Sequence, residues 1–505
     1  MLSLAEQLAL ARAGKEHCLR GGDRQAHQHG EDYLWMMGWA DNAVEEQLIM
    51  EKQYAEFLDG KKIEAQMRGM DSVPKLRSHL FPFQAHSVDF GLRAGSWGCF
   101  LDTGLGKTAC ELEWGYHAGA ASNGRTLILT PLAVARQIES EGLRWGYPIR
   151  VIREQEDAGE GINVCNYDRL DRLSPSEFGA VVLDESSIIK NFSGKTTRAL
   201  IGSFANHQWR MAATATPAPN DVTELGNHSE FLGVMPMNDM LVRWFINDTA
   251  DTGTWRLKGH ARAFFWDWMA SWCRMAEHPR DLGDDVEGYD LPPLRVFRHE
   301  ADSSDIKGEG LFAAQDVSAT GIHKVKRQTA ESRARTVAGI VNKDEPFLIW
   351  CDTDYEQDAL EKLLGAHCIS VRGSLNIDEK EARIGGWMRG DRPWMLSKSS
   401  IMGYGLNCQF CPNQIYAGRS FSYEAYYQAV RRSWRFGQKK QVNIHLVVAE
   451  GEESIGRVID RKAGDHLTMK REMTEAMLRA IGKGSIVRKP YNPIHNGRMP
   501  SWFGV

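Results

Sequence analysis

Short apolar runs alternate with longer amphipathic segments in two stretches of the chain. The first stretch covers residues 99–217, and the second begins after residue 345. The apolar runs have the length and composition of strands buried on both faces, which occur in parallel sheets with helical crossovers. The pattern therefore predicts an α/β fold with two lobes, each built on a parallel sheet. A chain of 505 residues also exceeds what one hydrophobic core usually organises.

Each stretch contains five apolar runs that we expect to form strands. They are GCFLD, RTLILTP, INVCNY, AVVLDE and WRMAATATP in the first, and PFLIWCD, HCISVRG, PWMLSK, NQIYAG and VNIHLVV in the second. The residues outside these stretches lack the alternation, so we expect them to be mostly helical. The predicted parts are a helical N-terminal extension (1–74), a first lobe (75–235), a helical insertion and linker (236–330), a second lobe (331–465), and a C-terminal helix with an extended tail (466–505).

The composition is typical of a water-soluble chain with large cores. Hydrophobic residues make up 42% and charged residues 25%, and no apolar run reaches the roughly 18 residues of a membrane span. The N-terminal residues do not follow the pattern of a signal peptide. The nine cysteines are scattered, which is typical of a reducing compartment, so we expect a cytoplasmic protein. A net charge of −5 does not exclude nucleic acid, because a local basic channel is enough to bind it.

A glycine-rich turn in FLDTGLGKTA, residues 100–109, predicts a phosphate site. Gly104 and Gly106 allow the backbone amides to point inward at the start of a helix, where they can hold phosphate oxygens. Lys107 can then reach the β- and γ-phosphates, and Thr108 can ligand Mg²⁺. Leu101 stands where the strict phosphate-loop pattern has glycine, so a chance glycine turn is the alternative at this point.

An acidic pair follows the apolar run VVLD. A buried strand would deliver Asp184 and Glu185 at its carboxyl end, where folds of this class place a metal-binding carboxylate and a base that activates water. The alternative is a strand that ends in a solvated acidic turn. The order of the glycine turn and the acidic pair, with an alternating βα segment between them, favours the functional interpretation.

These residues resemble the superfamily 2 helicase-like ATPases, and within them the Swi/Snf-like branch. The resemblance is closest to the DEAD/DEAH-type helicase proteins of bacteriophages and prophages, and it covers about residues 75–465 in motif order. It implies two RecA-like lobes that bind ATP with Mg²⁺. The missing glycine at Leu101 is common in this family. If the chain is phage-encoded, the expected location is the cytoplasm of the bacterial host.

In the first lobe, the resemblance implies roles for several further residues. LFPFQ is similar to the segment that recognises adenine, which makes Gln84 the base-reading side chain. DESSIIKN is similar to the family's DExH-x-IKN segment and supports metal and base roles for Asp184 and Glu185, although Ser187 replaces the usual histidine. Motifs Ia and Ib imply nucleic-acid contacts, and motif III in TATPAPN implies coupling residues. These are Thr130, Pro131, Asn166 and Tyr167 for nucleic acid, and Thr214 and Thr216 for coupling.

In the second lobe, two motifs complete the implied nucleotide site. SKSSIMGYGLNCQF resembles motif V and implies a nucleotide contact at Gly405. YYQAVRRSWRFGQ resembles motif VI, with Gln428 beside two arginine-finger candidates, Arg432 and Arg435. Planar guanidinium groups can supply the positive charge that a phosphoryl transfer needs, and residues three apart share a helical face. A basic, solvated helix is the alternative interpretation of these arginines.

The resemblance implies a motor that hydrolyses ATP and moves on DNA. Members of this branch usually track along duplex DNA, so duplex is favoured over single strands or RNA, and strand separation is the weaker expectation. One alternative is a nucleic-acid-binding clamp gated by ATP. Another is the translocase subunit of a restriction- or recombination-type assembly, because no nuclease centre is recognisable in the chain.

Three other segments leave alternatives open. The aromatic stretch around Phe264, Trp268 and Trp272 could stack bases, but its spacing of four residues favours packing of one helix face in a core. The basic segment 324–339 could approach phosphates or form a solvated helix face. The N-terminal extension faintly resembles ribosome modulation factor-like proteins, which would make it a site for a protein partner. Metal binding is the less favoured interpretation of Cys408 with Cys411, and of four N-terminal residues, His17, Cys18, His27 and His29.

Overall fold

The computed structural model describes residues 63–131, 134–247, 255–302, 319–402, 407–449 and 452–482. All of these residues belong to one unit, residues 63–505. Most of the predicted N-terminal extension and the extended C-terminal tail lie outside the described residues. Residues 63–74, which belong to the predicted helical extension, are described and form no helix.

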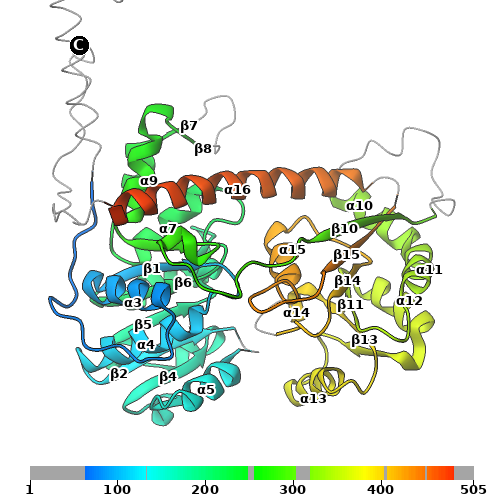
Figure 1. Cartoon of the computed structure of the whole chain (residues 1–505), viewed down its shortest axis with the longest axis horizontal. Helices are drawn as coiled ribbons and strands as arrows, with labels where there is room; N and C mark the ends of the chain where they lie inside the picture. The colour runs from blue at the N-terminus through cyan, green and yellow to red at the C-terminus, as the bar shows by residue number, and fades with distance from the viewer. Residues whose placement is uncertain are drawn as a thin grey trace, which may run out of the picture. The chain divides into compact units, whose positions relative to one another are not determined.

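The first lobe is built on a seven-stranded parallel sheet (Figure 1). Its strand order is β3-β4-β2-β5-β6-β1-β9. The strands are β1 (Ser96–Leu101), β2 (Arg125–Thr130), β3 (Ile149–Val151), β4 (Gly161–Asn166), β5 (Ala180–Asp184), β6 (Trp209–Ala213) and β9 (Cys273–Ala276). The helices are α3 (Pro82–Ala94), α4 (Lys107–Ala120), α5 (Ala135–Arg144), α6 (Lys195–Phe204), α7 (Leu225–Phe231), α8 (Met237–Trp244) and α9 (Arg262–Ala270).

Two hydrophobic clusters cover the two faces of this sheet. Along β1, Phe100 contributes to one cluster, whereas Cys99 and Leu101 contribute to the other. Successive side chains of a strand point to opposite faces, so a strand buried on both sides reads as a continuous apolar run. Since β1 and β5 flank β6, the segments that follow them leave the sheet at the same edge. This edge carries the candidate site.

The second lobe is built on a six-stranded parallel sheet in the order β10-β15-β14-β11-β13-β12. The strands are β10 (Arg295–Glu300), β11 (Phe347–Cys351), β12 (Cys368–Val371), β13 (Trp394–Lys398), β14 (Asn413–Tyr416) and β15 (Asn443–Val448). The helices are α10 (Ala319–Gln328), α11 (Ala330–Ile340), α12 (Asp354–Leu364), α13 (Ile377–Met388), α14 (Ser399–Met402) and α15 (Tyr423–Val430). The two parallel α/β lobes that we predicted from the sequence are therefore confirmed, with all ten apolar runs as strands.

The segment predicted as a helical insertion is only partly helical. It contains α8 and α9, but also an antiparallel hairpin of β7 (Phe245–Asn247) and β8 (Trp255–Leu257). Strand β9 then pairs with β1 at the edge of the first sheet, and β10 pairs with β15 at the edge of the second. The prediction missed these edge strands because they are short or, in β10, mostly exposed, and so lack the buried apolar run of a central strand.

The aromatic stretch of this segment packs mostly in the core, although not as one helix face. The side chains of Trp268 and Trp272 are fully buried in the same cluster as Phe100, whereas Phe264 is only half-buried and its neighbour Phe265 takes the core position. Trp272 lies just beyond the end of α9, so the three predicted rings do not form one helix face. Trp268 packs between Trp244, in a tilted arrangement with ring centroids 4.5 Å apart, and Trp272, edge to face at 5.4 Å. Buried rings of this kind are unavailable to bases.

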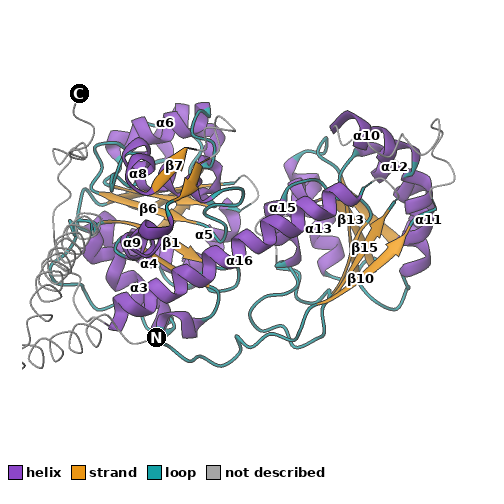
Figure 2. Cartoon of the chain, turned by 90° about the horizontal axis from the view of Figure 1, so that it is seen from above, coloured by secondary structure: helices purple, strands orange, loops and turns teal. Residues whose placement is uncertain are grey.

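A long C-terminal helix, α16 (Glu453–Gly482), follows the second sheet and contacts both lobes (Figure 2). Near its start, Ile455 and Ile459 pack with Tyr423 of α15. Near its end, Met469, Met473 and Met477 join the core of the first lobe. Among the described residues, none of the helices combines the length and the apolar composition that a membrane crossing requires.

Candidate functional site

The glycine turn lies between β1 and α4 and has the backbone that the sequence predicts. Gly104 and Gly106 adopt φ values of +96° and +78°, which side-chain-bearing residues rarely adopt. Gly106 is the N-cap of α4, so Lys107 and the half-buried Thr108 are the first two residues of the helix. The ammonium of Lys107 donates to the carbonyl of Leu101 at 3.1 Å. Free amides of a helix start and an ammonium therefore face the same turn.

Gln84, predicted to read adenine, is buried against this turn. Its amide nitrogen donates to the carbonyl of Leu105 at 2.8 Å, and its oxygen accepts from the backbone amide of Phe81 at 2.9 Å. A Cβ atom added at Gly106 would lie 2.3 Å from the Gln84 nitrogen. Gln84 thus connects the start of α3 to the glycine turn, and its role in base recognition stays a prediction.

The acidic pair lies at the end of β5, as the sequence indicates. The carboxylate of Asp184 accepts a hydrogen bond of 2.6 Å from Thr130, and its backbone carbonyl accepts one of 2.7 Å from the hydroxyl of Tyr167. Burial, followed by the neighbouring charge of Glu185, raises the pKa of Asp184 to about 6. Glu185 has a φ of 51°, and it is the one non-glycine residue with positive φ in the described part of the chain. Such backbone strain is concentrated at functional sites.

A further carboxyl group, which the sequence analysis did not single out, lies in the same place. Glu111 of α4 is fully buried beside Asp184, with which its carboxyl group interacts closely. Burial, followed by the charge of Asp184, raises its pKa well above its ordinary value. One oxygen of Glu185 is buried without a hydrogen-bond partner. These carboxyl groups and the ammonium of Lys107 lie close enough to influence one another's charge. The three carboxyl groups do not converge as a ready-made metal site in the described residues, so a cation such as Mg²⁺ would rely on Asp184 with Thr108 and the bound phosphates.

The second lobe meets the glycine turn directly. A Cβ atom added at Gly104 would lie 3.0 Å from the backbone nitrogen of Phe436 and 3.4 Å from the Cβ of Arg435. The amide of Gln428 donates to the hydroxyl of Thr216 at 3.5 Å. Thr214 and Thr216 are fully buried, and the hydroxyl of Thr214 accepts from the amide of Thr216 at 3.1 Å. The predicted motif VI residues and the predicted coupling residues therefore adjoin across the seam between the lobes.

The two arginine-finger candidates differ in exposure to solvent. Arg432 is buried, and Arg435 is half-buried. Burial, followed by repulsion from Arg432, lowers the pKa of Arg435 below its ordinary value. Two neighbouring guanidinium groups that repel each other in a partly desolvated place favour an anion between or beside them. Gly405 lies outside the described residues, so its predicted contact stays a prediction.

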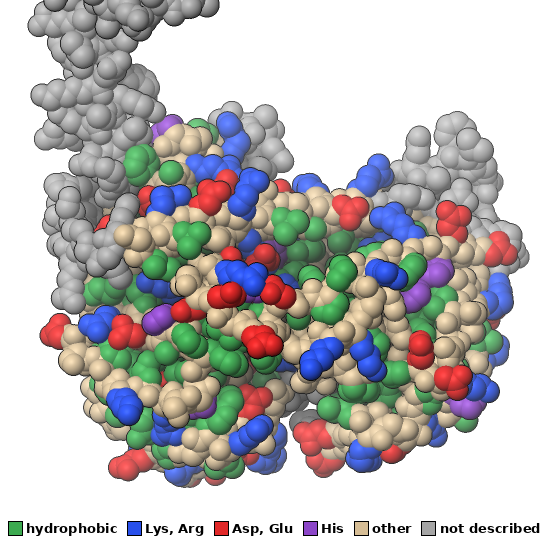
Figure 3. Space-filling model, viewed as in Figure 1, with side chains coloured by type: hydrophobic (Ala, Val, Ile, Leu, Met, Phe, Trp, Pro, Cys, Tyr) green, Lys and Arg blue, Asp and Glu red, His purple; other side chains and the backbone are tan. Residues whose placement is uncertain are grey.

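The residues predicted to face nucleic acid divide into two groups. Thr130 is fully buried, and Tyr167 is half-buried, and both donate to Asp184, so in this arrangement their side chains support the acidic pair. Pro131 and Asn166 are half-buried. On the face drawn in Figure 3, basic and acidic side chains are interspersed among the described residues. We see no broad field of one sign on the described part of that face.

Two of the cations in the basic segment 324–339 are also unavailable to phosphates. Lys326 is buried and forms an ion pair with Asp352 at 2.5 Å. Arg333 is fully buried and forms an ion pair with Glu452. Three cations, Lys324, Arg327 and Arg335, are exposed. The two cysteines of the C-x-x-C pair, Cys408 and Cys411, are buried free thiols, and no metal-binding group of three or more His, Cys, Asp or Glu occurs within the described ranges.

Comparison with known proteins gives matches to helicases. Residues 332–437 match the model of the helicase conserved C-terminal domain. The chain is 23% identical over 454 residues to a putative ATP-dependent helicase/translocase, YwqA, of Bacillus subtilis, covering 77% of this chain and 48% of that protein. It is 31% identical over 182 residues to the mouse DNA repair and recombination protein RAD54B, covering 30% of this chain and 20% of that protein.

A third relative is the mouse DNA annealing helicase and endonuclease ZRANB3, at 23% identity over 479 residues. The alignment covers 81% of this chain and 42% of that protein. The chain thus spans less than half of the length of each of these three relatives. Part of the second lobe thus matches the helicase C-terminal model, and about three quarters of the chain is similar to the helicase/translocase YwqA and to a SWI/SNF-related regulator of chromatin of Xenopus tropicalis, at 22–23% identity.

Proposed function

We propose that this chain is an ATP-dependent motor that hydrolyses ATP to ADP and phosphate while it moves along duplex DNA. The observation that supports the proposal most is the contact between the glycine turn of the first lobe and the segment of Arg435 in the second. A nucleotide held by the turn would receive its arginine contacts only when the lobes adjoin. Catalysis would then depend on lobe position, as a motor requires.

Each lobe would supply a different part of the reaction. The amides of the turn and Lys107 would bind the phosphates, and Thr108 and Asp184 would hold Mg²⁺. When it is bound, Mg²⁺ neutralises charge on the β- and γ-phosphates. Glu185 has a buried oxygen without a hydrogen-bond partner, which is able to accept a proton from an attacking water. Arg432 and Arg435 would stabilise the charge that develops on the transferred phosphoryl group.

The names of two relatives support DNA as the track. RAD54B is a DNA repair and recombination protein, and ZRANB3 is a DNA annealing helicase. The sequence RRSWRFGQ is similar to motif VI of proteins that track along duplex DNA. If both lobes grip the backbone, closure and opening of the ATP site would shift one grip relative to the other.

The test measures phosphate release from ATP in four conditions: without nucleic acid, and with duplex DNA, single-stranded DNA or RNA added. We expect the largest stimulation by duplex DNA. Stimulation by RNA alone would contradict the choice of track. ATP binding without stimulated hydrolysis would instead support an ATP-gated clamp.

Three variants assign the roles within this assay. Lys107→Ala and Glu185→Gln are expected to abolish hydrolysis, and the second should still bind ATP, because glutamine cannot act as a base. Arg435→Ala should lower kcat more than the affinity for ATP. Lys195→Ala is the matched control, since Lys195 is also the first residue of a helix after a glycine, but it is exposed and the preceding Gly194 has an ordinary φ of −63°. Full activity of Glu185→Gln would refute the assignment of the base.

A further inference from the structure

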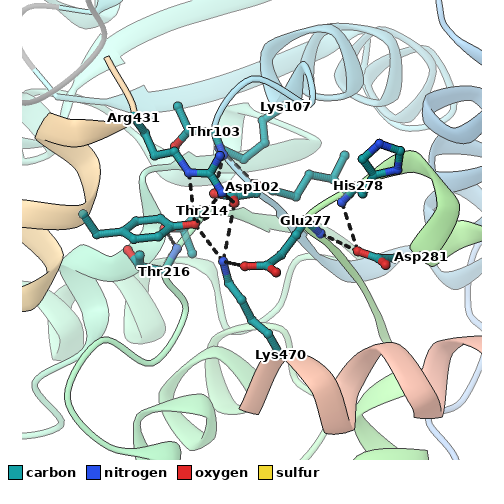
Figure 4. Close-up of polar contacts among 12 residues, drawn as sticks. Asp102, Thr103, Lys107, Thr214, Thr216, Glu277, His278, Asp281, Arg431 and Lys470 are labelled. Atoms are coloured by element: carbon teal, nitrogen blue, oxygen red, sulfur yellow. Dashed lines mark hydrogen bonds and ion pairs between the residues drawn. The ribbon is translucent and has the colours of Figure 1, made fainter. Parts of the chain in front are cut away.

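Asp102, two residues before Gly104, is the centre of a buried ionic cluster (Figure 4). The residue is 1% exposed. One of its oxygens accepts from the amide of Thr103 at 2.7 Å, and the other accepts from the hydroxyl of Tyr427 at 2.6 Å. Arg431 also donates to this second oxygen, and Lys470 lies 3.4 Å from it. The carboxylate thus joins the phosphate turn to two residues of the second lobe and one of α16.

The charges of this cluster balance. Lys470 forms a second ion pair with Glu277, which follows β9, and donates to the hydroxyl of Tyr427 at 2.7 Å. Two carboxylates therefore face two cations, Arg431 and Lys470, both of which are largely buried. The two cations hold the pKa of Asp102 well below its ordinary value, against the opposing effect of burial. Removal of one partner from such a cluster leaves an uncompensated charge unless it can reach water.

The three partners of Asp102 differ in the lobe to which they are attached. Tyr427 and Arg431 belong to the second lobe, through α15 and the turn after it. Lys470 lies in the part of α16 that packs on the first lobe, next to Met469 and Met473. Glu472, two residues on, accepts from Arg262 and from the indole of Trp266 in α9, both at 2.5 Å. Lys470 is therefore held near Asp102 by first-lobe contacts.

We propose that Lys470 is a positioning residue that ties α16 to the phosphate turn and prepares Asp102 for the arrival of Arg431. The inference rests on the proposed function for its link to ATP turnover. When the lobes open, Asp102 loses Arg431 and Tyr427 but keeps Lys470. When they close, the second cation and the hydroxyl rejoin it. In this way Asp102 stays ionised in both states, and lobe closure changes the contacts of a residue next to the turn that holds the phosphates.

The test compares Lys470→Met, Asp102→Asn and the double variant in the full chain. Lys470→Met leaves the Asp102–Arg431 pair balanced, and Glu277, whose side chain is 38% exposed, can reach water. Asp102→Asn leaves two buried cations against one carboxylate. We therefore expect the double variant to melt at a higher temperature than Asp102→Asn alone, because the second substitution removes the excess cation.

The second readout is ATP turnover with duplex DNA. We expect Lys470→Met to lower kcat by about tenfold while KM for ATP changes less than about threefold. The kcat of the double variant should equal that of the less active single variant, rather than show the product of the two fold-losses. Arg479→Met is the matched control, since Arg479 lies on the same helix and forms a half-exposed pair with Asp267 at 2.7 Å. Its kcat should equal that of the wild type.

Small-angle scattering separates this inference from the proposed function. Lys470→Met should have a larger radius of gyration than the wild type or Arg479→Met, because the closed arrangement loses the hydrogen bond from Lys470 to the hydroxyl of Tyr427, the contact by which Lys470 reaches the second lobe. This comparison needs no hydrolysis. A wild type without ATPase activity would refute the proposed function and leave the scattering result to decide the role of Lys470. Unchanged scattering, or wild-type kcat in Lys470→Met, would overturn the inference.

Discussion

Replacement of Gly104 by alanine would test the seam between the lobes directly. The variant meets two physical obstacles. An alanine at φ +96° costs about 1–2 kcal/mol of backbone strain. Its Cβ would also lie 3.0 Å from the backbone nitrogen of Phe436, where ordinary contacts begin near 3.4 Å. Because the neighbour is backbone, the turn and the second lobe must separate by a few tenths of an ångström.

The expected effect on catalysis follows from this displacement. A misplacement of about 1 Å costs about 100-fold in rate, so a few tenths of an ångström correspond to about three- to tenfold in kcat. Gly124→Ala is the matched control. Its φ is +82°, and no atom lies within 4 Å of the added Cβ, so it carries the backbone strain without the contact. Gly104→Ala should lower the melting temperature at least as much as Gly124→Ala, because it adds the contact to the backbone strain, and only Gly104→Ala should lower kcat.

Two assays separate the seam from the phosphate cradle. Stimulated phosphate release gives kcat, and the equilibrium affinity for ADP depends on the phosphate-binding turn of the first lobe alone. We expect ADP affinity within about threefold of the wild type, because the contact at Phe436 belongs to the other lobe. Equal kcat for Gly104→Ala and the wild type, with a loss of melting temperature at least equal to that of Gly124→Ala, would refute the importance of the seam.

Three further predictions concern individual side chains. Glu185→Gly should raise the melting temperature of the metal-free protein and abolish hydrolysis, because it relieves a positive φ and removes a like charge beside Asp184. Glu185→Gln removes only the charge, and a lower melting temperature for the glycine variant would contradict the strain argument. Burial lowers the pKa of His228 from 6.5 to about 4, so the neutral imidazole is favoured in the folded state. The free energy of unfolding is therefore highest above pH 6.5 and falls by up to about 3 kcal/mol as the pH drops toward 4. His228→Gln should make the free energy of unfolding depend less on pH over this range. Trp268→Ala should cost about 3–5 kcal/mol in stability because its ring is fully buried, and DNA affinity of the folded fraction should not change; a selective loss of DNA binding would mean that the ring contacts bases.

The central strands were predictable because each of them is buried on both faces. Runs such as RTLILTP carry their apolar character in consecutive residues, whatever lies elsewhere in the chain. Strand β3 has only three residues, one of them exposed, and β9 is four residues long and follows the aromatic helix α9 after two turn residues, so neither has a local signature. The edge strand β12 was predictable because its run HCISV is longer and partly apolar, whereas β3 and β9 depend on a partner strand that a local window does not contain.

The candidate site divides in the same way. Gly104, Lys107 and Asp184 lie within patterns of a few residues, and the structure brings their segments to one edge of the first sheet. Lys470 lies in a helix with no such pattern, and its partner Asp102 is 368 residues away in sequence. Glu111 gives no signal either, since a glutamate in a helix is usually solvated. Burial at these positions results from tertiary packing, which a sequence pattern does not encode.

The chain passes between the lobes twice, once in residues 277–294 between β9 and β10 and once in α16. A body joined to another at two separate places keeps chiefly one freedom, rotation about the line through both joints. The loop provides a soft joint, whereas α16, about 45 Å long at 1.5 Å per residue, provides a stiff one. A swing of the second lobe would therefore have to bend α16 or break its packing on one lobe, which limits how far Arg435 can move from the glycine turn.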